Sequence, residues 1–211
     1  MVKGKLYCSQ DNFRGQKILV TAKYSGKELE LEEHGDLSNF PLQSTPGLEF
    51  DKKYLNESQA IAFYLSNECL KGGPESFAQA QVLQWMCFAD QDLLPLIFNH
   101  VFPILELMPK PANYEDNSKT LFKHLEHLNA HLKLKTFFVG EKITLADIWI
   151  CLDLVMLMQH GLVKEDRDKH TYLIRWFQTI VNQKIVKEVI GEVVLCEKLQ
   201  PLKKGSIVRQ F

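Results

Sequence analysis

The chain has 211 residues, of which 45% are hydrophobic, and its 25 basic and 26 acidic side chains give a formal net charge of −1. This charge excludes the strongly basic surface that DNA or RNA binding requires, and the composition excludes a wholly disordered chain. A chain of this length buries enough surface for a core without disulfides, so we expect one large domain or two small ones.

Cysteine usage and the apolar segments indicate the compartment. The five cysteines are odd in number and widely spaced, unlike the dense, even set of a secreted disulfide scaffold. Residues 1–7 lack the apolar core of a signal peptide, and the most apolar stretch, 148–158, is interrupted by Asp153 and is too short for a membrane span. We therefore expect a cytoplasmic protein that binds neither membranes nor nucleic acid.

The first 72 residues predict a small α/β domain. Strands are expected at 5–8, 28–32, 46–50 and 53–55, where β-prone residues alternate or form short runs. The spacing of apolar residues predicts helices at 12–24 and 58–70. Between them, residues 34–45 are expected to be irregular because glycine, proline and polar residues break any period.

The segment Lys71-Gly-Gly-Pro74 is the clearest linker in the chain. After it, apolar periodicity predicts helices at about 77–100, with Pro95 and Pro103 marking a kink or break, and then at 114–135, 144–159, 172–182 and 184–189. The expected division is an α/β domain over 1–72, an all-helical domain over 76–199 and a tail over 200–211.

Thr144 and Asp147 open the most apolar of these helices. Their spacing matches a capping box, in which the threonine hydroxyl and the acidic side chain satisfy backbone N–H groups at the helix start. The functional alternative is that Asp147, an odd residue among apolar neighbours, is a buried catalytic acid. The spacing favours the structural interpretation.

Two short motifs suggest a ligand site in the α/β domain. Ser58 lies at the start of a predicted helix, where a hydroxyl and unpaired N–H groups suit an anion such as a carboxylate, unless Ser58 only caps its own helix. Thr45-Pro46 precedes a predicted strand. A cis bond there would turn the Thr45 backbone toward an extended, peptide-like ligand, and the alternative is a trans proline at a strand start.

Catalytic and metal-binding motifs are less well marked. Three residues near the first strand, Tyr7, Cys8 and Ser9, are nucleophiles or activators with no visible partner base. Three histidines share one helical face, but no cysteine or carboxylate has the spacing to complete a metal site, so a solvated or half-buried face is favoured: His124, His127 and His131. No phosphate-binding loop and no dinucleotide-binding glycine motif is present.

Several strings together resemble the glutathione S-transferase superfamily: Thr45-Pro46, Glu57-Ser58-Gln-Ala-Ile61 and Val139-Gly-Glu-Lys-Ile-Thr-Leu-Ala-Asp147. Others are similar to the transferase-like domain of the elongation factor 1-gamma family: Gln84-Trp-Met-Cys-Phe-Ala-Asp90, Val101-Phe-Pro103, Ile174-Arg-Trp-Phe177 and Ile190-Gly-Glu-Val-Val-Leu-Cys-Glu-Lys198. The resemblance runs from Leu6 to about Leu199. It implies a thioredoxin-like N-terminal domain followed by a helical-bundle C-terminal domain.

Residue by residue, the resemblance implies a glutathione-like ligand site. Thr45 and Pro46 match the superfamily's pre-proline and cis-proline positions, and Glu57 and Ser58 match the acidic residue and serine that hold the γ-glutamyl end of glutathione. Glutathione is then a ligand rather than a required cofactor, and no metal is expected.

The same resemblance places the helix-capping box at Thr144 and Asp147. It does not supply a catalytic residue, because the stretch where transferases carry their activating residue is Gln10-Asp11-Asn12-Phe13-Arg14 in this chain. Tyr7 and Ser9 do not align with that position, and they remain weak catalytic candidates.

The resemblance also implies a role in translation. We expect a non-catalytic scaffold subunit of the elongation factor 1 complex, which anchors the guanine-nucleotide-exchange subunits that recharge the tRNA-delivering GTPase. The alternatives are an active cytosolic glutathione S-transferase and an adaptor domain of an aminoacyl-tRNA synthetase complex, with valyl-tRNA synthetase or other synthetases as partners. By analogy with similar domains, a homodimer is a further option.

Overall fold

A mixed four-stranded sheet forms the first part of the chain in the computed structural model, which describes residues 4–201. The strand order is β2-β1-β3-β4, and the strands are β1 (Gly4–Tyr7), β2 (Leu29–Glu32), β3 (Gly47–Phe50) and β4 (Lys53–Asn56). β1 pairs in parallel with β2 and antiparallel with β3, and β3 pairs antiparallel with β4. The turn between β3 and β4 contains Asp51 and Lys52, both with positive φ, the backbone that a tight two-residue hairpin requires.

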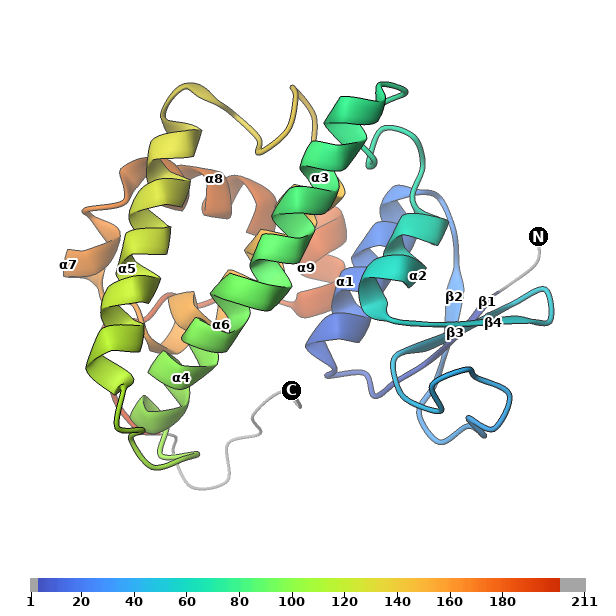
Figure 1. The fold of residues 1–211 in the computed structure, drawn as a ribbon, viewed down its shortest axis with the longest axis horizontal. Coiled ribbons are helices and arrows are strands. Elements are labelled where there is room, and N and C mark those ends of the chain that lie inside the picture. Colours follow the sequence, from blue (N-terminus) through green and yellow to red (C-terminus); the bar gives the residue numbers. More distant parts are fainter. Residues whose placement is uncertain (1–3, 202–211) are drawn as a thin grey trace.

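Two helices, α1 (Phe13–Tyr24) and α2 (Ser58–Leu65), pack with the sheet to form its core (Figure 1). Leu6 in β1 and Cys8, the residue after β1, lie in this core, and the alternation of side chains turns Tyr7 to the other face of the sheet. There the Tyr7 ring packs edge-on against Phe40, with the ring centroids 5.0 Å apart.

The helix predicted over 58–70 ends earlier, at Leu65. Ser66 has an extended backbone (φ −66°, ψ 144°), which stops the helical ladder. The side chain of Asn67 then accepts a hydrogen bond from the N–H of Leu70 at 2.9 Å. A local side-chain bond of this kind competes with helix formation, and the apolar spacing up to Leu70 did not reveal it.

The second part of the chain is helical. Its elements are α3 (Ser76–Phe88), the π-helical turn η1 (Ala89–Leu93), α4 (Leu94–Ile104), α5 (Tyr114–His131), the 3-10 turn η2 (Leu132–Leu134), α6 (Leu145–His160), α7 (Lys164–Arg167), α8 (Thr171–Val181) and α9 (Lys184–Ile190). The predicted order of an α/β part followed by an all-helical part is confirmed. Residues 202–211 of the predicted tail lie outside the described residues.

The helix predicted over about 77–100 is interrupted near Pro95, as the expected kink or break indicates, but the interruption lies in the turn before the proline. Pro95 occupies the first turn of α4, where its missing N–H does little harm. The irregularity comes just before it, because the turn from Ala89 to Leu93 is π-helical. Pro103 lies near the end of α4. The short helix α7 was not predicted.

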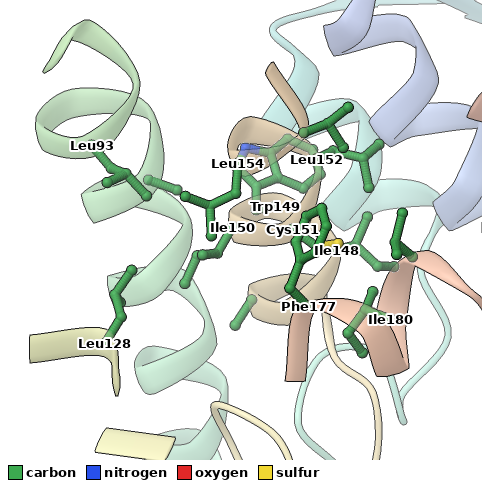
Figure 2. Packing of buried hydrophobic residues seen from close by; sticks show 14 of the residues in the cluster. Leu93, Leu128, Ile148, Trp149, Ile150, Cys151, Leu152, Leu154, Phe177 and Ile180 are labelled. Atoms are coloured by element: carbon green, nitrogen blue, oxygen red, sulfur yellow. The ribbon is translucent and has the colours of Figure 1, made fainter. Parts of the chain in front are cut away.

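α6 is the centre of the helical part. Every residue from Leu145 to Met158 is buried, as expected for a helix that is apolar all round and surrounded by other helices. Figure 2 shows its side chains between Leu93 and Leu128 on one side and Phe177 and Ile180 on the other. In residues 4–201, no helix is long and apolar enough to cross a membrane.

Candidate functional site

The predicted ligand residues lie at one end of the β3–β4 hairpin. Gly47 pairs with Asn56 across this hairpin, so Pro46 and Glu57, one residue outside that pair, are neighbours. The Thr45-Pro46 bond is cis, Thr45 is exposed and Pro46 is buried. The topology therefore brings together the two motifs that are 12 positions apart in the sequence.

Asn56 holds the loop that leads into this site. Its Oδ1 accepts a hydrogen bond from the N–H of Leu42 at 3.0 Å, and its Nδ2 donates to the carbonyl of Ser44 at 2.6 Å. Asn56 is 5% exposed, so its buried side chain holds the loop around residues 42–44 in place. Sequence reasoning did not single out this residue.

Glu57 and Ser58 open α2. Glu57 occupies the N-cap position with φ +67° and makes no side-chain capping bond. Ser58 is the first helical residue and is buried. The interpretation in which Ser58 caps its own helix is therefore wrong. The first N–H groups of α2 have no cap from the Glu57 side chain, which leaves them suited to an anionic group.

Tyr7 and Cys8 are poorly suited to activate a thiol. The Tyr7 hydroxyl donates to Oε2 of Glu49 at 2.7 Å, and this hydrogen bond raises the pKa of Tyr7 to about 12. Burial raises the pKa of Cys8 to about 11. Ser9 is half-buried in the turn before α1, where its carbonyl accepts the N–H of Asn12. A phenol with so high a pKa, already bound to a carboxylate, does not lower a thiol pKa.

Asp147 is fully buried and satisfies donors from three segments. Its Oδ2 accepts the N–H of Thr144 at 2.9 Å and the Thr144 hydroxyl at 3.0 Å, within a capping box at the start of α6. Its Oδ1 accepts the N–H of Phe138 at 3.0 Å and Nε1 of Trp176 at 2.8 Å. Burial raises the pKa of Asp147, and these hydrogen bonds oppose the shift. The surroundings are those of a structural carboxylate.

The α5 histidines pack on aromatic rings. The His124 ring lies 5.2 Å from that of Phe88, and Nε2 of His131 lies 3.0 Å from the carbonyl of Phe138. Burial lowers the pKa of both imidazoles. His127 is exposed. Within the described residues, no group of three or more His, Cys, Asp or Glu side chains is arranged to hold a metal ion.

Sequence reasoning missed a buried cluster where α1 meets the helical part. The Lys17 ammonium lies 2.6 Å from Oδ1 of Asp153 in α6 and 3.0 Å from Oδ1 of Asp90 in η1. Oδ2 of Asp90 accepts Nε2 of Gln59 at 2.7 Å and Nε1 of Trp149 at 3.0 Å. We call these five residues the Lys17 cluster. A carboxylate in the middle of an apolar stretch, at Asp153, was the one available signal.

Arg167 fastens residues 191–200 to the helical part. Its buried guanidinium donates to the carbonyl of Leu162 at 2.6 Å and to the carbonyl of Cys196, and it pairs with Glu197 at 3.1 Å. The N–H of Cys196 also donates to the carbonyl of Met158 at 2.7 Å. The string 190–198 is therefore anchored over the end of α6.

The surface formed by α2 and α3 exposes large apolar residues, and the two helices carry no charged residue of their own. Neither α2 nor α3 contains an Asp, Glu, Lys or Arg residue. Nε2 of Gln59 in α2 donates to the carbonyl of Met86 in α3 at 3.1 Å, so the two helices meet at this hydrogen bond. We define the α2–α3 surface by the exposed residues of the two helices: Ala60, Phe63, Tyr64, Ser76, Phe77, Ala80, Leu83 and Gln84.

The spacing along both helices is that of an outward-facing stripe. Phe63 and Tyr64 follow Ala60 by three and four positions in α2. The exposed residues of α3 likewise recur at intervals of three and four, which places them on one side of a helix. The Lys71 ammonium lies 4.5 Å from the centre of the Phe63 ring and the Lys27 ammonium 5.8 Å from that of Tyr64, so lysines border the α2 part of this surface. Exposed large apolar residues with a polar border are typical of a protein interface.

Comparisons with known proteins identify the fold of the chain. Residues 85–184 match the family model of the glutathione S-transferase C-terminal domain. The fold is similar to the GST-like domain of elongation factor 1-gamma from Saccharomyces cerevisiae, with a TM-score of 0.84 and 24% identity over 96% of this chain and 100% of that one. A delta-class glutathione transferase from Nilaparvata lugens gives a TM-score of 0.74 at 22% identity, over 88% of this chain and 92% of that one. The chain thus has the glutathione S-transferase fold.

Sequence similarity to curated proteins indicates which proteins of this fold the chain is related to. The chain is 41% identical to elongation factor 1-gamma of Artemia salina over 94% of its own length and 49% of that protein. It is 40% identical to elongation factor 1-gamma of Drosophila melanogaster over 94% of its length and 48% of that protein. The chain is therefore a relative of elongation factor 1-gamma, and it spans about half the length of the curated relatives it matches.

Proposed function

We propose that the chain is a non-catalytic scaffold subunit of the translation elongation factor 1 complex, which anchors the guanine-nucleotide-exchange subunits. Its similarity to elongation factor 1-gamma over 94% of its length supports a place in that complex. The observation that carries the anchoring role is the α2–α3 surface, because it exposes four large hydrophobic side chains, which are costly to leave in water: Phe63, Tyr64, Phe77 and Leu83.

The contacts around the first strand support a binding role over a catalytic one. Tyr7 is held by Glu49 on the face of the sheet opposite the α1–α2 core. Cys8 is buried in that core with a raised pKa. The active-transferase alternative would rest on Ser9 alone, in the turn before α1.

The α2–α3 surface is proposed to bind an exchange subunit of elongation factor 1. Phe77 is 68% exposed and Leu83 is 47% exposed, so both side chains are free to insert into pockets of a partner. A few side chains that fill well-packed pockets at the centre of an interface carry most of its binding free energy. A second copy of the chain and an aminoacyl-tRNA synthetase are the competing occupants.

Reconstitution tests the proposal. The purified chain would be mixed with purified exchange subunits of elongation factor 1, and the mass of the complex measured by analytical ultracentrifugation. We expect a stable complex that contains both proteins. A chain that forms only a homodimer, or that binds valyl-tRNA synthetase but no exchange subunit, would contradict the proposal.

We also propose that Thr45, Pro46, Glu57 and Ser58 form a site for glutathione or a similar γ-glutamyl peptide. The uncapped first turn of α2 beside the exposed Thr45 supports it, because helix N-terminal N–H groups suit the carboxylate of such a ligand. This ligand is proposed to bind without being turned over.

A further inference from the structure

The Lys17 cluster places two carboxylates around one ammonium group at the contact between α1 and the helical part. The side chains of Lys17 and Asp153 are fully buried, and that of Asp90 is 23% exposed. Both carboxylates lie within 3.0 Å of the same nitrogen. With every group ionised, the cluster holds one cation and two anions. One negative charge is therefore left over in a largely buried environment.

The two carboxylates are not equivalent. Asp90 accepts hydrogen bonds from Gln59 and Trp149 in addition to Lys17. Oδ2 of Asp153 is buried and has no hydrogen-bond partner among the described residues. Hydrogen bonds favour the ionised form of a carboxyl group, and burial without them favours the neutral form. Asp90 is therefore the partner that stays ionised beside Lys17, and Asp153 is the group that takes up a proton.

Few other charges act on Asp153. Among the described residues, Arg14 in α1 is a further cation whose charge reaches it and lowers its pKa. α3 has no charged residue and α4 has none except the imidazole of His100, which bonds Ser118 and Gly161. On α8, Arg175 bonds the carbonyls after α5. The turn η1 contributes a further acidic residue, Asp92, and no cation. Arg14 therefore offsets the surplus charge of the cluster only in part, and α3 and α4 supply no cation to it.

We propose that the Lys17 cluster is a proton-binding site, in which Asp153 carries one exchangeable proton and its release as pH rises weakens the attachment of α1 to α6. The neutral carboxyl leaves a balanced Lys17–Asp90 ion pair. The ionised carboxylate adds a second negative charge beside the one ammonium group, between the two parts of the chain.

The sign of the pH dependence follows from the two states of Asp153. Burial raises its pKa from 3.8 to about 7 in the folded chain, while in the unfolded chain it titrates as an ordinary aspartate. Between these values the folded state binds more protons than the unfolded state, so stability falls as pH rises. The loss is complete once the pH exceeds the folded pKa.

Urea unfolding of the wild-type chain and of Asp153→Asn tests the proposal. The amide mimics the neutral carboxyl. We expect the unfolding constant of the wild type, divided by that of Asp153→Asn, to rise up to about tenfold per pH unit from about pH 5 toward neutrality and then to level off. The matched control, Asp116→Asn, changes a side chain that is 83% exposed and should give a constant ratio. A constant ratio for Asp153→Asn would overturn the proposal.

A second measurement does not depend on whether the variant folds. The carboxyl carbon of Asp153, assigned by NMR in the ¹³C-labelled wild-type chain, should titrate near neutral pH, and that of Asp90 should not. An Asp153 carboxyl that is already ionised at about pH 5 would refute the proton site directly.

Discussion

The indole Nε1 of Trp176 donates a 2.8 Å hydrogen bond to Oδ1 of Asp147, and this bond joins α8 to the first turn of α6. The same carboxylate accepts the N–H of Phe138 and the N–H of Thr144. One side chain therefore fixes the start of the central helix relative to the preceding loop and to α8.

Replacement of Asp147 by Ala should strongly destabilise the chain. The change leaves the N–H of Phe138, the N–H of Thr144 and the Trp176 indole without their acceptor, and a buried unsatisfied donor costs about 1–3 kcal/mol. We expect a loss of about 3–4 kcal/mol in the free energy of unfolding, measured by urea denaturation. Asp116→Ala on the surface is the control. A loss no larger than that of the control would show that the network is not needed.

Removal of the Tyr7 hydroxyl should affect stability but not chemistry. Tyr7→Phe loses the 2.7 Å bond to Glu49, so we expect about 1 kcal/mol less stability. In a conjugation assay with glutathione and a model electrophile, the wild type, Tyr7→Phe and Ser9→Ala should all match the uncatalysed rate. A wild-type rate above that background, lost in either variant, would restore the enzyme hypothesis.

Glutathione binding should depend on the start of α2. Ser58→Ala removes the only hydroxyl in that helix's first turn, so we expect weaker binding of glutathione by isothermal titration calorimetry, by about fivefold to tenfold for the loss of one hydrogen bond. Ser38→Ala, in an exposed loop, should leave the affinity unchanged. Equal affinities for Ser58→Ala and the wild type would place the ligand elsewhere.

Residues 191–200 should detach when Arg167 is replaced by Met. The change removes the donor to the carbonyls of Leu162 and Cys196 and the partner of Glu197. Since hydrogen bonds from charged groups contribute about 1.5–3 kcal/mol each, amide exchange in this segment should accelerate at least about tenfold. Arg175→Met, which frees the carbonyls after α5 instead, should not alter it. Unchanged exchange in Arg167→Met would contradict the anchoring role.

The general architecture was predictable because it rests on local signals. Strand alternation, helical spacing and the glycine-rich linker gave the α/β part and the helices after it. The Thr144 and Asp147 spacing pointed to the capping arrangement that the structure has, because both residues lie within one helical turn.

The remaining features depend on contacts between distant residues. Lys17 is 73 positions from Asp90, and no periodicity reveals that pair. The early end of α2 at Leu65 depends on the extended backbone of Ser66 and on a side-chain hydrogen bond of Asn67, which apolar spacing does not report. The α2–α3 surface was hidden for a related reason: Leu83 looks like a core residue in the sequence, and only packing shows that it faces outward.

Binding of a purified elongation factor 1 exchange subunit to two matched variants tests the central claim most directly. Leu83 is 47% exposed on the α2–α3 surface, and Leu107, after α4, is 45% exposed outside it. Because a carboxylate at the centre of an interface is left unpaired, Leu83→Glu should raise the dissociation constant by about thirtyfold or more, while Leu107→Glu should leave it unchanged. Undiminished binding by Leu83→Glu, or an equal loss in both variants, would contradict the account.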